Sequence, residues 1–190
     1  MGSLPSFFCL MTNTKKTIQD LARISTEEFR AKNKFPIAVI LDNIRSLNNI
    51  GSIFRSSDAF AVSKIALCGI TATPPSVEIH KTALGAENSV DWTYYPSTLD
   101  AIADLRKQGF TICAVEQCQG SISLEKFAPD PAQKYAIIMG HEVYGVDQAA
   151  VDAADLCLEI PQFGTKHSLN VAVTTGIILW HLTAALLNQK

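Results

Sequence analysis

The stretch Ile160-Pro-Gln-Phe-Gly-Thr-Lys-His-Ser-Leu-Asn170 separates two apolar segments of different length. Residues 156–160 before it have the length of one buried strand, and residues 171–187 after it have the length of a long buried helix. Pro161 interrupts the strand, Gly164 permits an irregular loop, and Ser168 is expected to cap the helix. The stretch therefore predicts a strand, a polar loop and a long helix that begins at about Ser168.

Two further segments upstream also combine glycine with polar side chains next to an apolar run. Asn49-Ile-Gly-Ser-Ile-Phe-Arg55 follows the apolar run 35–41, and Gly140-His-Glu-Val-Tyr-Gly145 follows the apolar run 135–139. A glycine directly after a strand lets the backbone approach a ligand closely. Taken alone, the second segment is better explained as an ordinary strand-to-helix turn. The functional interpretation therefore depends on all three segments together.

Strand-length and helix-length patterns alternate from residue 35 onward. Such alternation predicts a mostly parallel sheet with helices on both faces, in which ligands lie at the carboxyl ends of the strands. The three motifs fall at these ends. In the helix after Ser97 the spacing predicts that four residues face the core: Leu99, Ile102, Ala103 and Leu105. Strands are expected at 35–41, 64–70, 110–115, 135–139 and 156–160.

The sequence divides at residue 35 into two regions. Residues 1–34 are expected to form an N-terminal extension that is helical from about residue 14, with inward-facing Ile18, Leu21 and Ala22. Within it, Ser25-Thr-Glu-Glu28 has the pattern of a capping box that begins a second short helix. Residues 35–190 form the main domain, and a total of 190 residues fits one domain with a short extension.

The composition is that of a globular protein with no dominant charge. Hydrophobic residues make up 47% of the chain and the net charge is -2, so an RNA partner would need a local basic patch. The five cysteines form no Cys-x-x-Cys pair, which disfavours a disulfide framework and a zinc site and suggests reduced thiols in the cytoplasm. Residues 171–187 are short for a membrane span and contain Thr174, Thr175 and His181, so a buried helix is expected and no membrane partner.

In this order, the three motifs resemble those of SPOUT-class RNA 2′-O-ribose methyltransferases, specifically the TrmH-like branch, whose third motif ends in a Ser-Leu-Asn triplet. The resemblance covers nearly everything from Phe35 onward. It implies the α/β-knot fold, with a mostly parallel sheet flanked by helices and a C-terminal trefoil knot. It also implies S-adenosyl-L-methionine as cofactor and a homodimer. The knot is an inference from the family alone, because unknotted chains are the default.

The resemblance also assigns roles to individual residues, and it implies no metal. Because a guanidinium with a pKa above about 12 is a poor proton acceptor, Arg55 is expected to stabilise the alkoxide and hold a phosphate, with the proton acceptor unassigned. The expected RNA contacts are Arg45, Lys81 and Lys166. The expected catalytic residues are Arg55, Asn49, Glu142, Ser168 and Asn170. The expected cofactor-binding residues, several acting through the main chain, are Gly140, Gly145, Ile160, Leu169 and Glu116.

The resemblance implies methylation of a ribose 2′-hydroxyl in structured RNA, either tRNA or rRNA, with guanosine as the common target of the family. One alternative is a catalytically inactive SPOUT-fold protein that binds RNA or assists assembly. Another is a small-molecule enzyme that uses a nucleotide, although the segment 140–147 lacks the Lys and Ser/Thr of a phosphate loop and no Gly-x-Gly-x-x-Gly occurs. A hydrolase built on Ser168 would need a Gly-x-Ser-x-Gly turn, which is also missing.

Overall fold

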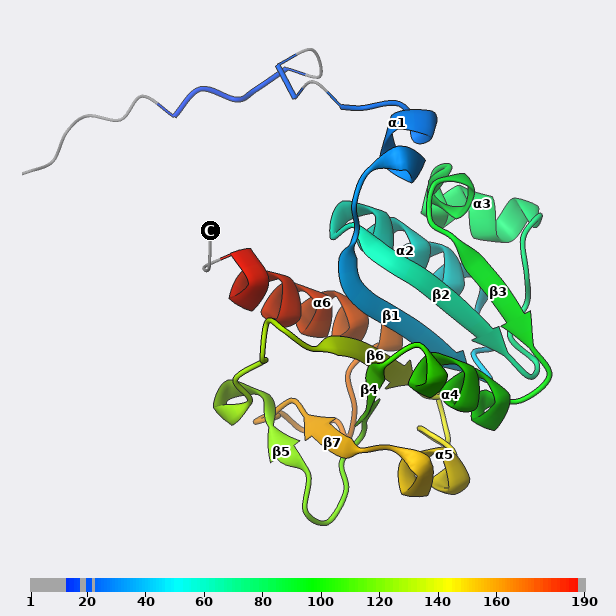
Figure 1. Cartoon of the computed structure of the whole chain (residues 1–190), viewed down its shortest axis with the longest axis vertical. Helices are drawn as coiled ribbons and strands as arrows, with labels where there is room; N and C mark the ends of the chain where they lie inside the picture. The colour runs from blue at the N-terminus through cyan, green and yellow to red at the C-terminus, as the bar shows by residue number, and fades with distance from the viewer. Residues whose placement is uncertain (1–12, 18–19, 22, 188–190) are drawn as a thin grey trace, which may run out of the picture.

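A computed structural model describes residues 13–17, 20–21 and 23–187 of the 190-residue chain (Figure 1). The strands are β1 (Phe35–Asp42), β2 (Val62–Cys68), β3 (Trp92–Tyr95), β4 (Phe110–Val115), β5 (Ile122–Ser123), β6 (Lys134–Met139) and β7 (Leu156–Glu159). The α-helices are α1 (Thr26–Ala31), α2 (Leu47–Ala59), α3 (Val77–Ala83), α4 (Thr98–Lys107), α5 (Gln148–Ala153) and α6 (Val171–Leu187). Two short 3₁₀ helices are η1 (Ala86–Asn88) and η2 (Leu124–Lys126).

In the described residues the strands form one seven-stranded sheet in the order β3-β2-β1-β6-β4-β7-β5. Every pairing in it is parallel, which confirms the predicted sheet. The central strand β1 pairs with both β2 and β6, and its residues from Ile37 to Leu41 have no exposed surface. A strand covered on both faces reads as a continuous apolar run, which is why 35–41 was recognisable from sequence.

Helices cover both faces of the sheet. Ile37, Val39 and Leu41 point into a core shared with α2, α3 and α6, whereas the alternate residues Ala38 and Ile40 point into a second core shared with α4 and α5. Figure 1 shows α4 in front of the strands, α5 next to it, and α2 behind the strands. The two cores hold the carboxyl ends of the central strands in fixed positions, which is where the three motifs lie.

Gly51 in the first motif allows close packing of α2 against α3. A Cβ at this position would lie 2.1 Å from Thr82 Oγ1 and 2.3 Å from the main-chain oxygen of Ile79. No side chain fits there without moving backbone, so the glycine fixes the distance between the two helices. Its role is therefore packing, which sets the position of the helix that carries Asn49.

Two details predicted from sequence were wrong: the buried face of α4 and the end of β2. In α4 the residues facing inward are Thr98, Ala101, Ile102 and Leu105, whereas Leu99 is 45% exposed and Ala103 is also exposed. The Ser97 cap and the pair Ile102 and Leu105 set the helical phase, and this phase turns position 99 to solvent. Strand β2 ends at Cys68 because Gly69 adopts a φ of +61°, which leaves Ile70 64% exposed beyond the turn.

The N-terminal extension is less helical than predicted. The capping box is confirmed, because the Ser25 side chain accepts from the Glu28 N–H and the Glu28 side chain accepts from the Ser25 N–H at the start of α1. The expected helix from residue 14 is absent from the described residues 13–17, 20–21 and 23–25, which contain one turn. Leu21 is 44% exposed, so this segment lacks the packing that a short helix needs. Ile18 and Ala22 lie outside the described residues.

Three general expectations concern cysteines, metals and membranes. The four cysteines in the described part of the chain are free thiols, whereas Cys9 lies outside it. Burial raises the pKa of Cys68 and of Cys113 to about 12, so neither thiol is reactive at neutral pH. No described group of three or more His, Cys, Asp or Glu side chains is arranged to hold a metal ion. None of the described helices has the length and apolar character needed to cross a membrane.

Candidate functional site

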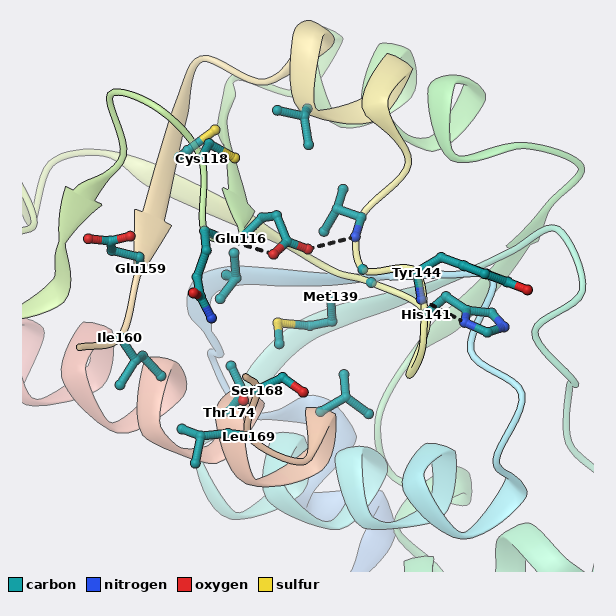
Figure 2. A pocket seen from close by; sticks show the side chains of 18 of the residues that line it. Glu116, Cys118, Met139, His141, Tyr144, Glu159, Ile160, Ser168, Leu169 and Thr174 are labelled. Carbon is teal, nitrogen blue, oxygen red and sulfur yellow. Dashed lines mark hydrogen bonds between the residues drawn. The ribbon is translucent and has the colours of Figure 1, made fainter. Parts of the chain in front are cut away.

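A cleft of about 1060 Å³ opens at the carboxyl ends of β4, β6 and β7. It is lined by residues 115–119, 139–146, 157–160 and 167–171, so the second and third motifs form most of its walls. Figure 2 shows Glu116, Ile160 and Ser168 facing the same space from three separate segments of the chain. The position agrees with the rule that open parallel sheets bind ligands beyond the carboxyl ends of their strands.

The structure brings together most, but not all, of the residues singled out from sequence. Those that line the cleft are Gly140, Glu142, Gly145, Glu116, Ile160, Ser168, Leu169 and Asn170. Those that do not are Asn49, Arg55, Arg45, Lys81 and Lys166. All five expected cofactor-binding residues are thus in the first group. Among the second group, Asn49 is connected to the cleft through hydrogen bonds, as described below.

The second motif is a tight loop that excludes side chains at both of its glycines. A Cβ on Gly140 would lie 2.2 Å from the backbone of Gly145 and Val146, and Gly145 has a φ of +71°. The N–H of His141 donates to the oxygen of Gly145, and the reverse bond is also present, each at 2.9 Å. These contacts close the loop, so the backbone of the motif approaches the cleft without an intervening side chain.

His141 has a structural part in this loop. Its Nδ1 accepts hydrogen bonds from the N–H groups of Val143 at 3.0 Å and Tyr144 at 3.3 Å. The imidazole also stacks on the Tyr144 ring, with centroids 4.8 Å apart (Figure 2). Because both backbone N–H groups donate to Nδ1, the loop fixes the orientation of the ring. His141 therefore shapes the loop.

Glu116 joins the end of β4 to the second motif. Its Oε2 accepts from the N–H of Val146 and its Oε1 accepts from the N–H of Gln117, both at 2.9 Å (Figure 2). A Cβ on Gly145 would lie 2.1 Å from Oε2, so a side chain there would displace this carboxylate, and the φ of +71° already favours glycine at the position. Glu116 lines the cleft as expected, and its hydrogen bonds hold two of the cleft walls together.

Glu142 connects the second motif to the first. Its carboxylate accepts from the N–H of Arg45 at 3.1 Å, from the N–H of Ser46 at 2.9 Å, and from Asn49 Nδ2 at 3.0 Å. These donors lie at the N-terminus of α2, where the helix dipole also favours a negative charge. Partial burial alone would raise the pKa of Glu142, but these hydrogen bonds lower it below its usual value. Glu142 is therefore a stable carboxylate that orients Asn49.

Asn170 connects the third motif to the same group of residues. Its Nδ2 donates to Asn49 Oδ1 at 3.1 Å, while its Oδ1 accepts from the N–H groups of Ala172 at 2.9 Å and Val173 at 3.3 Å. Asn170 is thus the cap of α6, so the prediction that Ser168 caps this helix was wrong. The helix begins at Val171, three residues later than Ser168. Glu142, Asn49 and Asn170 form one hydrogen-bonded chain, the three-motif chain, in which every amide orientation is fixed.

The loop of the third motif is open. Every residue from 161 to 170 is exposed. Within the described structure, no main-chain N–H of residues 162–170 donates to another protein group. Apart from the hydrogen bonds of Asn170, one described contact tethers the loop, a hydrogen bond from Gln117 Nε2 to the main-chain oxygen of His167 at 2.8 Å. Main-chain groups near Ser168 and Leu169 are therefore available to a ligand in the cleft.

The expected cationic residues lie away from the cleft in a single chain. Arg55 is exposed on α2, about one and a half turns beyond Asn49. Lys81 makes an exposed ion pair with Glu78 at 2.6 Å, and Lys166 is exposed on the loop of the third motif. Arg45 is exposed, and its main-chain N–H donates to the carboxylate of Glu142. One chain alone therefore does not bring Arg55 to the three-motif chain.

Asp42 was missed by the sequence analysis. This residue ends β1, is 1% exposed, and accepts from Thr98 Oγ1 at 2.6 Å, Asn43 Nδ2 at 2.9 Å and the N–H of Asp147 at 2.8 Å. It thereby ties β1 to the starts of α4 and α5, behind the second motif. A charged residue directly after the apolar run 35–41 was the available signal.

A fully parallel sheet covered on both faces, with a cleft of loop backbone beyond its carboxyl edge, places the chain among the α/β folds in which that edge is the usual ligand site. Sequence comparison gives the class more narrowly. The chain belongs to the SpoU rRNA Methylase family, which it matches over residues 36–180.

Similar proteins are known in bacteria. The chain is 28% identical over 165 residues to the 23S rRNA (guanosine-2′-O-)-methyltransferase RlmB of Shewanella oneidensis, covering 87% of this chain and 66% of that protein. It is 27% identical over 154 residues to the tRNA (guanosine(18)-2′-O)-methyltransferase of Thermus thermophilus, covering 81% of this chain and 77% of that protein. The chain thus spans slightly less than two thirds of the Shewanella protein.

Solved structures share the fold. The AdoMet-bound rRNA methyltransferase from Sinorhizobium meliloti superposes with a TM-score of 0.74 at 28% identity, covering 83% of this chain and 60% of that one. The TrmH/SpoU tRNA modifying enzyme of A. aeolicus superposes with a TM-score of 0.75 at 24% identity, covering 86% and 83%. The expected fold class is therefore confirmed as that of the SpoU and TrmH enzymes.

Proposed function

We propose that the chain is an S-adenosyl-L-methionine-dependent methyltransferase that modifies a ribose 2′-hydroxyl in structured RNA, with guanosine in tRNA or rRNA as the expected target. The observation that carries the proposal is the three-motif chain, which joins Glu142, Asn49 and Asn170 at one side of the cleft. Membership of the SpoU family and the names of the Shewanella and Thermus relatives support the same activity.

The cleft fits the proposed cofactor in size and in chemistry. A volume of about 1060 Å³ accommodates a nucleoside with an amino-acid side arm. The exposed main chain near Ser168 and Leu169 offers hydrogen-bonding groups for an adenosine, and the glycines of the second motif let the backbone approach it. Carboxylates of Glu116, Glu142 and Glu159 also line the cleft, which favours a cationic sulfonium. When bound, the cofactor supplies the electrophilic methyl group.

The residues around the cleft are suited to positioning a ribose. The Asn170 amide uses one N–H on Asn49 and keeps a second N–H, and the Asn49 amide likewise keeps one after donating to Glu142. Both amides are held rigidly, so they can orient a hydroxyl for in-line displacement. Glu142 itself is a poor candidate for proton removal, because three donors already hold its carboxylate in the ionised form.

A homodimer is part of the proposal. On α6 the residues Val173, Ile177 and Trp180 are 54%, 36% and 58% exposed, and their spacing places them on one helical face. Trp180 also lies 6.2 Å from the Phe60 ring at the end of α2. A second copy seated on this apolar face would bury it. Helix α2, which carries Arg55, packs on α6. A dimer contact on α6 would therefore also bring the Arg55 of one copy toward the cleft of the other.

Several further expectations belong to this proposal. The C-terminal trefoil knot and the division into residues 1–34 and 35–190 stay predictions. The same holds for RNA contacts by Arg45, Lys81 and Lys166, all of which are exposed and therefore accessible to RNA. These contacts would give affinity that falls with salt concentration.

The decisive experiment is transfer of label from methyl-labelled S-adenosylmethionine to bulk RNA from cells that lack this protein. Nuclease digestion then locates the methyl group on base or ribose. The proposal requires ribose label that is abolished by Asn49→Ala. Label confined to bases would contradict the assigned reaction.

A second candidate function is an inactive RNA-binding protein of the same fold. The position of Arg55 outside the cleft of its own chain is the observation that favours it. This candidate requires RNA binding without label transfer in the experiment above, whether or not the cofactor binds.

A further inference from the structure

A second cavity, of about 560 Å³, lies between α1, α3, η1 and β3. Its walls include Arg30, Pro75, His80, Glu87 and Trp92. Strand β3 forms one edge of the sheet, whereas the cleft lies beyond β4, β6 and β7 toward the other edge. The two cavities share no lining residue, so this one needs its own explanation.

Glu87 is an incompletely paired carboxylate in the wall of this cavity. The residue is 8% exposed, and its Oε1 lies 2.5 Å from His80 Nδ1. Its Oε2 is buried and has no hydrogen-bond partner among the described residues. Burial alone would raise the pKa of Glu87, but the hydrogen bond to His80 and the nearby backbone N–H groups of Glu87 and Gly85 lower it below its usual value. Because Oε2 has almost no accessible surface, a ligand in the cavity reaches it only when the Glu87 side chain turns, and a donor on the ligand would then replace the missing hydrogen bond.

The other walls of the cavity suit a flat ring attached to an anion. Trp92 is half-buried and Pro74 and Pro75 are adjacent apolar surfaces, which together suit stacking against a planar group. Arg30 is exposed on α1 and adds a cation at the cavity. The His80 side chain is 63% exposed, so it can move aside and uncover Oε1. A carboxylate for N–H donors, an aromatic face and a guanidinium are the groups that proteins use to hold an unstacked nucleotide.

We propose that this cavity, the Glu87 pocket, binds one unstacked nucleotide of the RNA substrate and prefers guanine. The choice of RNA as the ligand rests on the proposed function. Guanine presents two adjacent N–H donors on its Watson–Crick edge, which match the two oxygens of the Glu87 carboxylate once His80 has moved aside and the carboxylate has turned toward the cavity. Uracil presents a single N–H between two carbonyl oxygens, and these repel the carboxylate. Cytosine and adenine present one amino group next to an acceptor nitrogen, so they are expected to bind with intermediate affinity.

The test uses the full chain labelled with ¹⁵N and four nucleoside monophosphates as probes. The chain has two tryptophans, so Trp92→Phe assigns the two indole N–H signals by NMR. Saturating S-adenosylmethionine keeps the probes out of the cleft. We expect GMP to shift the Trp92 signal and leave Trp180 unchanged, with a Kd about tenfold below that of UMP. In Glu87→Gln this preference should fall by about tenfold.

A matched control is Glu78→Gln, which changes an exposed glutamate of α3 that pairs with Lys81 outside the pocket. It should keep the preference for GMP. Arg30→Ala, on the exposed side of α1, should weaken GMP more than guanosine and gives a second reading if Glu87→Gln fails to fold. Equal responses to all four nucleotides, or no response of Trp92, would overturn the proposal.

The outcome is separable from the proposed activity. If the chain transfers methyl groups to RNA but no nucleotide shifts the Trp92 signal, the pocket proposal fails and the activity stands. If GMP shifts the signal selectively while no RNA is methylated, the pocket stands as a nucleotide site and the activity fails. In an active enzyme, Glu87→Gln should raise the KM for RNA with little change in kcat, because the residue lies outside the cleft.

Discussion

Glu142 is the residue at which the three motifs meet, and its role is structural as much as chemical. It accepts three hydrogen bonds from the start of α2 and thereby sets the orientation of Asn49. Asn49 in turn receives the amide of Asn170. The centre is thus a carboxylate followed by two amides, which is a positioning device and contains no acid–base pair. This explains why residue types alone did not identify a proton acceptor.

The lowered pKa of Glu142 predicts a pH-dependent contribution to stability. Because the folded pKa lies below the ordinary 4.5, the ionised group stabilises the fold above that pH, and the contribution is lost as pH falls through the folded value. Glu142→Gln should lower the free energy of unfolding at pH 7 by about 1 to 2 kcal/mol, since the residue is only partly buried. Urea unfolding from pH 7 to pH 3 measures this, and a difference that does not shrink at low pH would contradict it.

Glycine substitutions test whether cofactor binding needs the close backbone packing at Gly140 or only a flexible glycine in the loop. Gly140→Ala places a Cβ 2.2 Å from the backbone of the second motif, so we expect the loop to shift and cofactor binding to fall at least tenfold. Gly164→Ala is the matched control, because a Cβ there has nothing within 4 Å. Calorimetric titration with S-adenosylmethionine compares the two variants. Equal loss in both would show that the second motif does not depend on close approach.

Helix α6 begins where Asn170 both caps it and reaches toward Asn49, so one residue serves the element and the site. Asn170→Ser retains a good cap but loses the amide donor, so stability should change by only a few tenths of a kcal/mol while methyl transfer falls strongly. Asn170→Ala should lose about 1 kcal/mol in addition. Thermal unfolding and the transfer assay give the two readings. Full activity in Asn170→Ser would show that the link to Asn49 is dispensable.

The elements that could be predicted from sequence are those with strong burial. β1, β4 and β6 are recognisable because both of their faces are covered, so they read as apolar runs. β3 and β5 lie at the edges of the sheet, and β5 has two residues, so neither carries a comparable signal. The start of α6 was misplaced because Ser168 and Asn170 are both good caps, and only the tertiary contact with Asn49 distinguishes them.

At the scale of the whole molecule, the apolar face of α6 is a surface that one chain leaves uncovered. If a second copy covers it, Trp180→Glu should convert a dimer to a monomer. The matched control is Leu99→Glu, which changes a 45% exposed residue on α4, at the other face of the sheet. Sedimentation velocity distinguishes the two species. A wild-type chain that sediments as a monomer at micromolar concentration would contradict the proposed homodimer.

The candidate site was predictable only in part, because it is assembled from distant segments. The order of the motifs indicated which residues to examine, and the structure brings Glu142 and Asn49 into contact across 93 positions of sequence. The supporting contacts of Asp42 and Glu116 depend on the sheet order and on the packing of α4 and α5, which no local pattern encodes. Arg55 has the same difficulty at a larger scale, since it does not line the cleft of its own chain, and the proposed homodimer would have to bring it to one.

The central claim is that the cleft and the three-motif chain together transfer a methyl group to ribose. The most direct test is mass spectrometry of nucleosides from RNA incubated with S-adenosylmethionine and either the wild-type chain or Asn49→Ala. We predict that a 2′-O-methylated nucleoside, expected to be 2′-O-methylguanosine, accumulates with the wild-type chain and falls at least a hundredfold with the variant. Equal accumulation with both proteins, or a methyl group found only on a base, would contradict the account.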